Sequence, residues 1–279
     1  MAAGRKQHKH RRGKGRLGKL IQLLFVIALV AAMSVGATVF FRVEEIEVSG
    51  NSRYSSEEIV AVTGIQAGDN LFHMNKFAIR DRVLEEMPYV ESILIRRKLP
   101  SAIAVTVEEW GAVARVTPNP DWVAPEPEQG KEDVVLPEAT QQTWLISVGG
   151  KLLEAAGEGD GPMLLSGLTA LDAREGTQIA VPEEEQERLS AVLALLEELE
   201  SRNMTAEVSR MDVSSTTVVL EYRGRYDVKL PLVSDLSYKL DALQAAVADR
   251  EGVQGDRASG TFDLTQKNYT VVYSPRRLG

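Results

Sequence analysis

The feature that most constrains this chain is an uncharged run of 22 residues at positions 20–41. A helix rises about 1.5 Å per residue, so a run of this length can span a hydrocarbon core about 30 Å thick. Its polar side chains are Gln22, Ser34 and Thr38, which a membrane helix tolerates. The sequence therefore predicts one transmembrane helix at residues 20–41.

The charges that flank this run indicate its orientation. Residues 1–19 contain eight basic residues and no acidic one, whereas Glu44 and Glu45 follow the run. Basic residues favour the cytoplasmic side, so we expect a cytoplasmic basic tail at 1–19 and an extracytoplasmic C-terminus. A cleaved signal peptide is the alternative, but its apolar region usually has about 7–15 residues, and this run is longer. We therefore expect an uncleaved, single-pass anchor in the cell membrane.

Composition argues against several classes of function. Beyond the tail, 24 basic residues face 40 acidic ones, and such an acidic body does not suit nucleic-acid binding. The chain has no cysteine, which excludes Cys-based zinc sites and Cys–His catalysis, and His73 is its one histidine beyond the anchor. Carboxylates are plentiful, but nothing selects a catalytic pair. The sequence thus predicts no catalytic residue, metal or cofactor. The basic tail is interpreted as a topology signal, with binding of nucleic acid or anionic lipid as the alternatives.

Residues 42–110 show the pattern of a compact β-α-α-β-β unit. Apolar and polar residues alternate from Val43 to Val48, as in a strand. Ser55 and Glu58 form a capping-box pattern at the start of a first helix. A second helix begins after Asn75, with an expected buried face made of Phe77, Val83, Leu84 and Met87. Two alternating strands then follow on either side of the turn at residues 99–101, which predicts a hairpin.

Residues 111–279 read as a second, mixed β-rich domain, so the expected fold class is α+β. A Pro- and Glu-rich loop at 118–142 separates two short strands. Pro182 suits the first turn of an amphipathic helix, where its missing N–H has no partner to lose. A last helix and a final strand at 268–273 complete the pattern.

The sequence VEEIEVSGNSRYSSEEIVAVTGIQAGDNLFHMN, followed by MPYVESILIRRKLPSAIAVTVEEW, resembles the POTRA domain of FtsQ/DivIB-type bacterial cell division proteins. The most specific part joins a helix end, a strand, a Pro turn and a second strand at fixed offsets. It runs from Pro88 to Glu109. Weaker pieces farther along, such as Gly260-x-x-Asp263-Leu264 before the last strand, follow the family's order. One departure is Glu109-Trp110-Gly111, where the family often has Arg-x-Pro.

This resemblance implies a non-enzymatic scaffold at the division septum. Its partners would be FtsL-like and FtsB/DivIC-like bitopic proteins, which link it indirectly to septal peptidoglycan synthesis. The resemblance also places the final strand at a sheet edge, where a partner segment can add a further strand. The residues expected to bind the partner are Lys267, Asn268, Tyr269, Thr270, Val271, Val272 and Tyr273. The alternative is an internal strand whose tyrosines belong to the core.

Two other functional classes stay open at this stage. A membrane-anchored cell-wall hydrolase or regulator would need a cleft with two carboxylates of raised pKa. A POTRA-bearing secretion component would usually carry repeated POTRA units, and the sequence shows one. An open strand edge near the C-terminus, without such a cleft, would favour the division scaffold.

Overall fold

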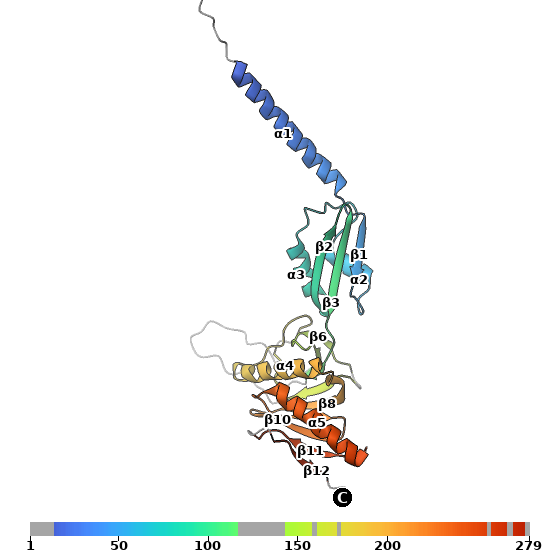
Figure 1. Ribbon diagram of the computed structural model, residues 1–279, viewed down its shortest axis with the longest axis vertical. Helices are drawn as coiled ribbons and strands as arrows, with labels where there is room; N and C mark the ends of the chain where they lie inside the picture. Colours follow the sequence, from blue (N-terminus) through green and yellow to red (C-terminus); the bar gives the residue numbers. More distant parts are fainter. Residues whose placement is uncertain are drawn as a thin grey trace, which may run out of the picture.

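The computed structural model describes residues 14–116, 143–157, 161–171, 174–255, 258–266 and 270–276. Helix α1 (Lys14–Phe40) projects from one end of the molecule, followed by a three-stranded unit and then a nine-stranded unit (Figure 1). Where side chains are described, no helix has an apolar stretch long enough to cross a membrane. Most of the basic tail and the whole loop at 118–142 lie outside the described residues.

The three-stranded unit has the β-α-α-β-β order that the sequence predicts. Its elements are β1 (Glu45–Ser49), α2 (Ser56–Thr63), α3 (Lys76–Glu86), β2 (Val90–Lys98) and β3 (Ala102–Glu109). The sheet order is β1-β3-β2, with β1 parallel and β2 antiparallel to the central β3. Strand alternation buries one face of this sheet against α2 and α3, which leaves the other face exposed.

Local capping signals define both helices of this unit. The Ser55 side chain accepts from the Glu58 N–H, and the Glu58 carboxylate accepts from the Ser55 N–H, which completes a capping box. Asn75 caps α3 through its side-chain oxygen. The expected buried face of α3 was wrong at Phe77, which is 72% exposed. The buried face is set by Ile79 and Val83, four residues apart, and Phe77 points away from it because it lies two residues before Ile79.

Glu109 ties the end of β3 to the turn that precedes α2. Its carboxylate accepts hydrogen bonds from the N–H groups of Ser52 at 2.9 Å and Arg53 at 2.8 Å, and from the Ser52 hydroxyl at 2.6 Å. Burial would raise the pKa of Glu109, but these hydrogen bonds outweigh it and lower the pKa below its ordinary value. This role explains why a carboxylate suits position 109, where the most specific part of the family resemblance ends.

The nine-stranded unit combines a single mixed sheet with two main helices. Its strands are β4 (Ala114–Val116), β5 (Trp144–Ile146), β6 (Leu152–Ala155), β7 (Met163–Ser166), β8 (Val208–Val213), β9 (Thr217–Tyr222), β10 (Tyr226–Pro231), β11 (Gly260–Asp263) and β12 (Val272–Pro275). Its helices are η1 (Glu183–Glu185), α4 (Gln186–Ser201), η2 (Thr205–Glu207) and α5 (Leu236–Gln254). The sheet order is β12-β11-β10-β9-β8-β7-β4-β5-β6.

One face of this sheet forms the larger core. Leu196 of α4 and Leu240 of α5 are fully buried, as are Leu220, Val228 and Phe262 from the central and C-terminal strands. In β9 and β10, buried residues alternate with partly or fully exposed ones. The helices therefore cover one face, and the opposite face meets solvent. The strands that flank the loop at 118–142 are β4 and β5, which pair antiparallel.

The final strand differs from its predicted position. In the described residues it spans Val272–Pro275 rather than 268–273. Its pairing with β11 begins at Asp263↔Val272. The Asp263 side chain accepts from the Thr265 N–H at 2.9 Å and hydroxyl at 2.6 Å, which makes the turn that ends β11.

The two units meet at a junction made of polar contacts, of which those of Lys151 are buried. Lys151, 8% exposed, lies just before β6 and donates to the backbone oxygens of Leu84 at 3.1 Å and Val90 at 3.3 Å in the three-stranded unit. Glu154 of β6 accepts from the Tyr89 hydroxyl at 2.8 Å and pairs with Arg53 at 2.8 Å. These contacts fasten one edge of the larger sheet to the smaller unit.

Tyr226 of β10 offers a simple test of the core. Its side chain is completely buried, and its hydroxyl has no hydrogen-bond partner among the described residues. Burial raises the pKa of this tyrosine. Because an unpaired buried hydroxyl destabilises a fold, we expect Tyr226→Phe to leave stability unchanged or raise it by about 1 kcal/mol, as measured by urea unfolding. A loss above about 1 kcal/mol would show that the hydroxyl has a stabilising partner.

Candidate partner-binding edge

The two edges of the nine-stranded sheet differ in what covers them. At the β6 edge, the Leu152 N–H donates to Thr177 O, and the Gly176 N–H donates to Leu152 O, both at 2.8 Å. The segment around Gly176 and Thr177 therefore occupies the β6 edge. β12 ends the sheet at the other side, and among the described residues no further strand pairs with it (Figure 1). An exposed strand edge can pair with an added strand.

The register shows which backbone groups of β12 face outward. The pairs Asp263↔Val272 and Thr261↔Ser274 continue to a hydrogen bond from Arg276 N–H to Ser259 O at 3.0 Å. Residues that exchange hydrogen bonds alternate along an antiparallel pair, so residues 272, 274 and 276 bond inward to β11. The N–H groups of Val271 and Tyr273 then point away from the sheet. Pro275 adds an outward carbonyl but has no N–H to donate.

Tyr273 is fixed by the core rather than projecting from the edge. Its ring lies 4.9 Å from that of Phe262, centroid to centroid, and the Arg250 guanidinium lies 4.8 Å above it. Its hydroxyl donates to Ser259 O at 2.8 Å. The side chain of Val272 is 43% exposed on the other face. Tyr273 thus offers its backbone at the edge, while its ring holds β12 against the rest of the unit.

Two further interactions hold the edge strand in place. Arg276 forms an ion pair with Asp227 of β10 at 2.8 Å. Lys239 of α5 is almost fully buried, and its ammonium donates to Leu264 O and to Gln266 O, the latter at 3.3 Å. Helix α5 and strand β10 therefore both fix the pair of strands β11 and β12. A lysine within a helical pattern gives no sequence signal for this role.

The structure describes four of the seven predicted partner-binding residues. Lys267, Asn268 and Tyr269 lie outside the described residues. Thr270 and Val271 precede β12, and Val272 and Tyr273 form its first half. Sequence reasoning missed Ser274, Pro275 and Arg276, which complete the edge, because the strand begins later than the alternation of residues suggests.

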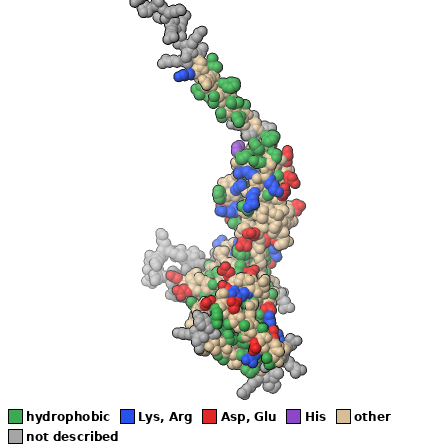
Figure 2. Space-filling model, in the orientation of Figure 1, with side chains coloured by type: hydrophobic (Ala, Val, Ile, Leu, Met, Phe, Trp, Pro, Cys, Tyr) green, Lys and Arg blue, Asp and Glu red, His purple; other side chains and the backbone are tan. Residues whose placement is uncertain are grey.

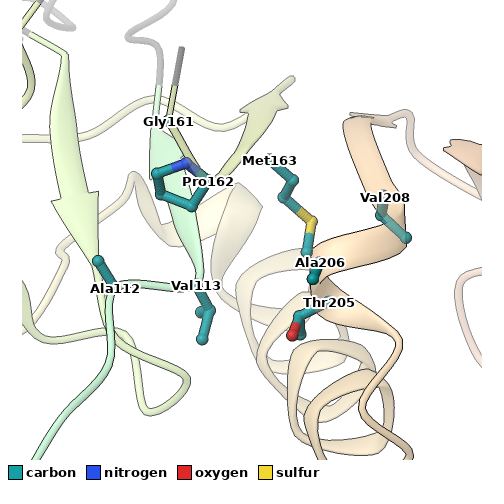
Figure 3. A pocket seen from close by; sticks show the side chains of 8 residues that line it. All are labelled: Ala112, Val113, Gly161, Pro162, Met163, Thr205, Ala206 and Val208. Carbon is teal, nitrogen blue, oxygen red and sulfur yellow. The ribbon is translucent and has the colours of Figure 1, made fainter. Parts of the chain in front are cut away.

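A pocket lies between β4, β7 and η2. It measures about 430 Å³ (Figure 3). Its lining residues are Ala112, Val113, Gly161, Pro162, Met163, Thr205, Ala206 and Val208. None of these residues has an ionisable side chain, so the pocket gives no support to carboxylate-based hydrolysis.

Among the described carboxyl groups, Glu91 has a raised pKa. Burial is the main cause, and the nearby carboxylates of Glu108 and Glu200 add to it. Glu91 lies on the exposed face of β2 and does not line this pocket. The described residues contain no group of three or more His, Cys, Asp or Glu side chains arranged to hold a metal ion.

The fold and its open edge define a two-unit protein that joins a POTRA-type unit to a mixed sheet. Comparison with known proteins specifies the class of the first unit: residues 41–110 match the family described as "POTRA domain, FtsQ-type". The FtsQ/DivIB-type resemblance, and the POTRA domain it implies, are therefore confirmed.

Curated relatives carry the matching names. The chain is 32% identical to "Cell division protein FtsQ" of Corynebacterium glutamicum over 95 residues, covering 33% of this chain and 42% of the relative. It is 22% identical to "Cell division protein DivIB" of Clostridium acetobutylicum over 204 residues, or 72% of each chain. With "Cell division protein DivIB" of Bacillus subtilis, identity is 27% over 109 residues, 39% of this chain and 41% of the relative. The chain thus matches less than half the length of the Corynebacterium and Bacillus relatives.

Proposed function

We propose that this chain is a non-enzymatic scaffold of the bacterial cell division machinery. The open β12 edge is the observation that carries this proposal, because it offers unpaired backbone groups of an ordered strand. The similarity to proteins named FtsQ and DivIB supports the division role. The alternative of a cell-wall hydrolase would need two carboxylates of raised pKa in a cleft, and among the described residues Glu91 is the carboxyl group whose pKa is raised.

The scaffold binds by strand addition. An extended segment of a partner pairs with the outward N–H and C=O groups around Val271 and Tyr273, and the sheet gains a tenth strand beside its nine. Main-chain hydrogen bonds supply affinity in this mode, and neighbouring side chains supply specificity. On the face opposite α5, the exposed side chain of Val272 is placed to contact alternate residues of such a segment.

The partners we propose are the FtsL-like and FtsB/DivIC-like bitopic proteins, which connect the scaffold to the septal peptidoglycan synthase. Recruitment to the septum places the chain at the cell membrane. We propose that residues 20–41 anchor it there, with the N-terminus in the cytoplasm. The uncharged run in the sequence supports this proposal. Within the run, the side chains of residues 34, 35 and 37–39 are not among those that the structure describes. In α1, the described large apolar side chains from Leu20 to Met33 are exposed.

A single backbone N–H can test strand addition. In Val271→Pro the outward N–H is lost, but no hydrogen bond to β11 is removed. We expect at least a tenfold loss of affinity for the external segment of the DivIC-like protein from the same genome, about 1.4 kcal/mol. The measurement is titration calorimetry with the purified full-length chain in detergent.

The matched control is Val271→Ala, which shortens the same side chain but keeps the N–H. It should bind within about threefold of the parent, because a strand-addition partner reads the backbone. Circular dichroism and thermal unfolding establish that both variants retain the sheet. Equal binding by the parent and a folded Val271→Pro chain would place the interface elsewhere.

A further inference from the structure

The end of the POTRA domain that joins α1 carries large apolar side chains that face solvent. Phe40 is 66% exposed, Phe72 is 51%, Phe77 is 72% and Leu99 is 60%. They come from the end of α1, from the segment leading into α3, from the first turn of α3 and from the turn between β2 and β3. Exposed apolar side chains gathered in this way commonly mark an interaction surface.

Ring packing and hydrogen bonds bring these segments together. The Phe41 ring packs edge-on against both Phe40 and Phe72, with centroid distances of 5.2 Å. Leu71 N–H donates to Phe41 O at 3.0 Å. The guanidinium of Arg97, near the end of β2, lies 5.5 Å from the Phe72 ring centroid and donates to Leu71 O. The last turn of α1 is therefore fastened to this end of the domain without a flexible linker.

Basic side chains accompany the aromatic ones. Figure 2 shows Lys and Arg gathered on the part of the POTRA domain nearest α1. The basic residues on the α3 and β2 side of this end are Lys76, Arg80, Arg96, Arg97 and Lys98. Arg80 pairs with Asp81, and Lys98 pairs with Glu47, both as exposed ion pairs that water weakens. Glu44 and Glu45 lie on the β1 side of this end, away from α3 and β2.

Aromatic rings and flexible cations are the side chains that settle at the boundary between lipid headgroups and water. We propose that this end of the POTRA domain rests on an anionic phospholipid bilayer, with Phe72, Phe77 and Leu99 among the headgroups and the neighbouring Lys and Arg side chains against their phosphates. This inference rests on the anchor in the proposed function. Because α1 ends at Phe40 and Phe41 already packs on the domain, a bilayer spanned by α1 would meet this surface directly.

The test uses the full chain in lipid nanodiscs, either of phosphatidylcholine alone or with phosphatidylglycerol added. The chain has no cysteine, so His73→Cys accepts a single environment-sensitive fluorophore beside Phe72. Spin-labelled lipids in the disc should quench this fluorophore strongly. Quenching should increase with phosphatidylglycerol and fall with salt, since screening weakens attraction to anionic headgroups. A label at Ala248→Cys in α5, in the far unit, should stay unquenched (Figure 1).

The variant Phe77→Ser with Arg80→Ser removes one exposed apolar and one exposed basic group. We expect quenching at position 73 to fall at least twofold, and amides of residues 71–80 to exchange faster, since one basic residue changes lipid binding by roughly fivefold. The control Val253→Ser with Lys229→Ser makes the same two kinds of change on exposed residues of the other unit and should alter neither. Thermal unfolding confirms that both double variants fold.

The possible results of these measurements test the lipid-facing surface and the membrane anchor separately. A chain retained by the discs but unquenched at position 73 would overturn the lipid-facing surface and leave the anchor intact. A chain that the discs do not retain would overturn both. Equal quenching with and without phosphatidylglycerol would overturn the anionic specificity.

Discussion

Replacing Gly50 with alanine is expected to lower the free energy of unfolding by about 3 kcal/mol or more. Gly50 follows β1 with φ at 87°, a conformation that side chains other than glycine rarely adopt. An added Cβ would lie 2.0 Å from Val107 O of β3, which is well inside van der Waals contact. To relieve this, β1 must move away from the central strand, and the parallel β1–β3 pairing would be lost at that end.

Gly68 provides the matched control in the same domain. Its φ is 93°, yet an added Cβ would meet no atom within 4 Å. Gly68→Ala should therefore cost about 1–2 kcal/mol, the backbone strain alone. Urea unfolding of both variants, analysed with a common slope, gives the comparison. Equal losses would show that the close approach to β3 contributes nothing.

Replacing Lys151 with methionine is expected to be the second large effect, a loss of about 1–3 kcal/mol. Methionine keeps most of the apolar stem but removes the ammonium that donates to Leu84 O and Val90 O. Leu84 O belongs to the last turn of α3, where carbonyls lack partners within the helix and a cation is favoured. Burial already lowers the pKa of Lys151, so its charged form depends on these acceptors.

The same variant should loosen the junction between the two units. Because the chain lacks cysteine, one introduced cysteine in each unit can carry a spin label. Double electron–electron resonance then measures the distribution of distances between the two labels. We expect a broader distribution for Lys151→Met than for the parent. Lys229→Met, at an exposed site on β10, should change stability by less than about 0.5 kcal/mol and leave the distribution unchanged. A narrow distribution in Lys151→Met would mean that Glu154, Tyr89 and Arg53 suffice to fix the orientation.

The POTRA domain was predictable because its signals are local. The capping pattern at Ser55 and Glu58, the Asn75 cap and the alternation in β2 and β3 each report on a few neighbouring residues. The exposure of Phe77 was not predictable in this way. It depends on which face of α3 meets the sheet, and an aromatic residue in a helix favours a prediction of burial when only the sequence is read.

The second unit was less predictable because its order is set by distant pairings. Parallel pairing of β10 with β11 requires α5 to cross between them, and β7 joins β4 to β8 across long stretches of sequence. Lys151 follows two glycines and has the sequence pattern of an exposed turn, yet it is buried by a partner from the other unit. The open edge of β12 came from the family resemblance, since no residue pattern distinguishes an edge strand from an internal one here.

The composition of the β12 edge bears on how copies of this chain behave when they are crowded together. An open edge can pair with the same edge of another copy, which is a common start of aggregation. This edge is only four residues long, Pro275 removes one donor, and Arg276 adds a charge next to it. Two such edges would form few hydrogen bonds with each other. The edge is therefore long enough for a complementary segment to extend it, but poorly suited to joining sheets into polymers.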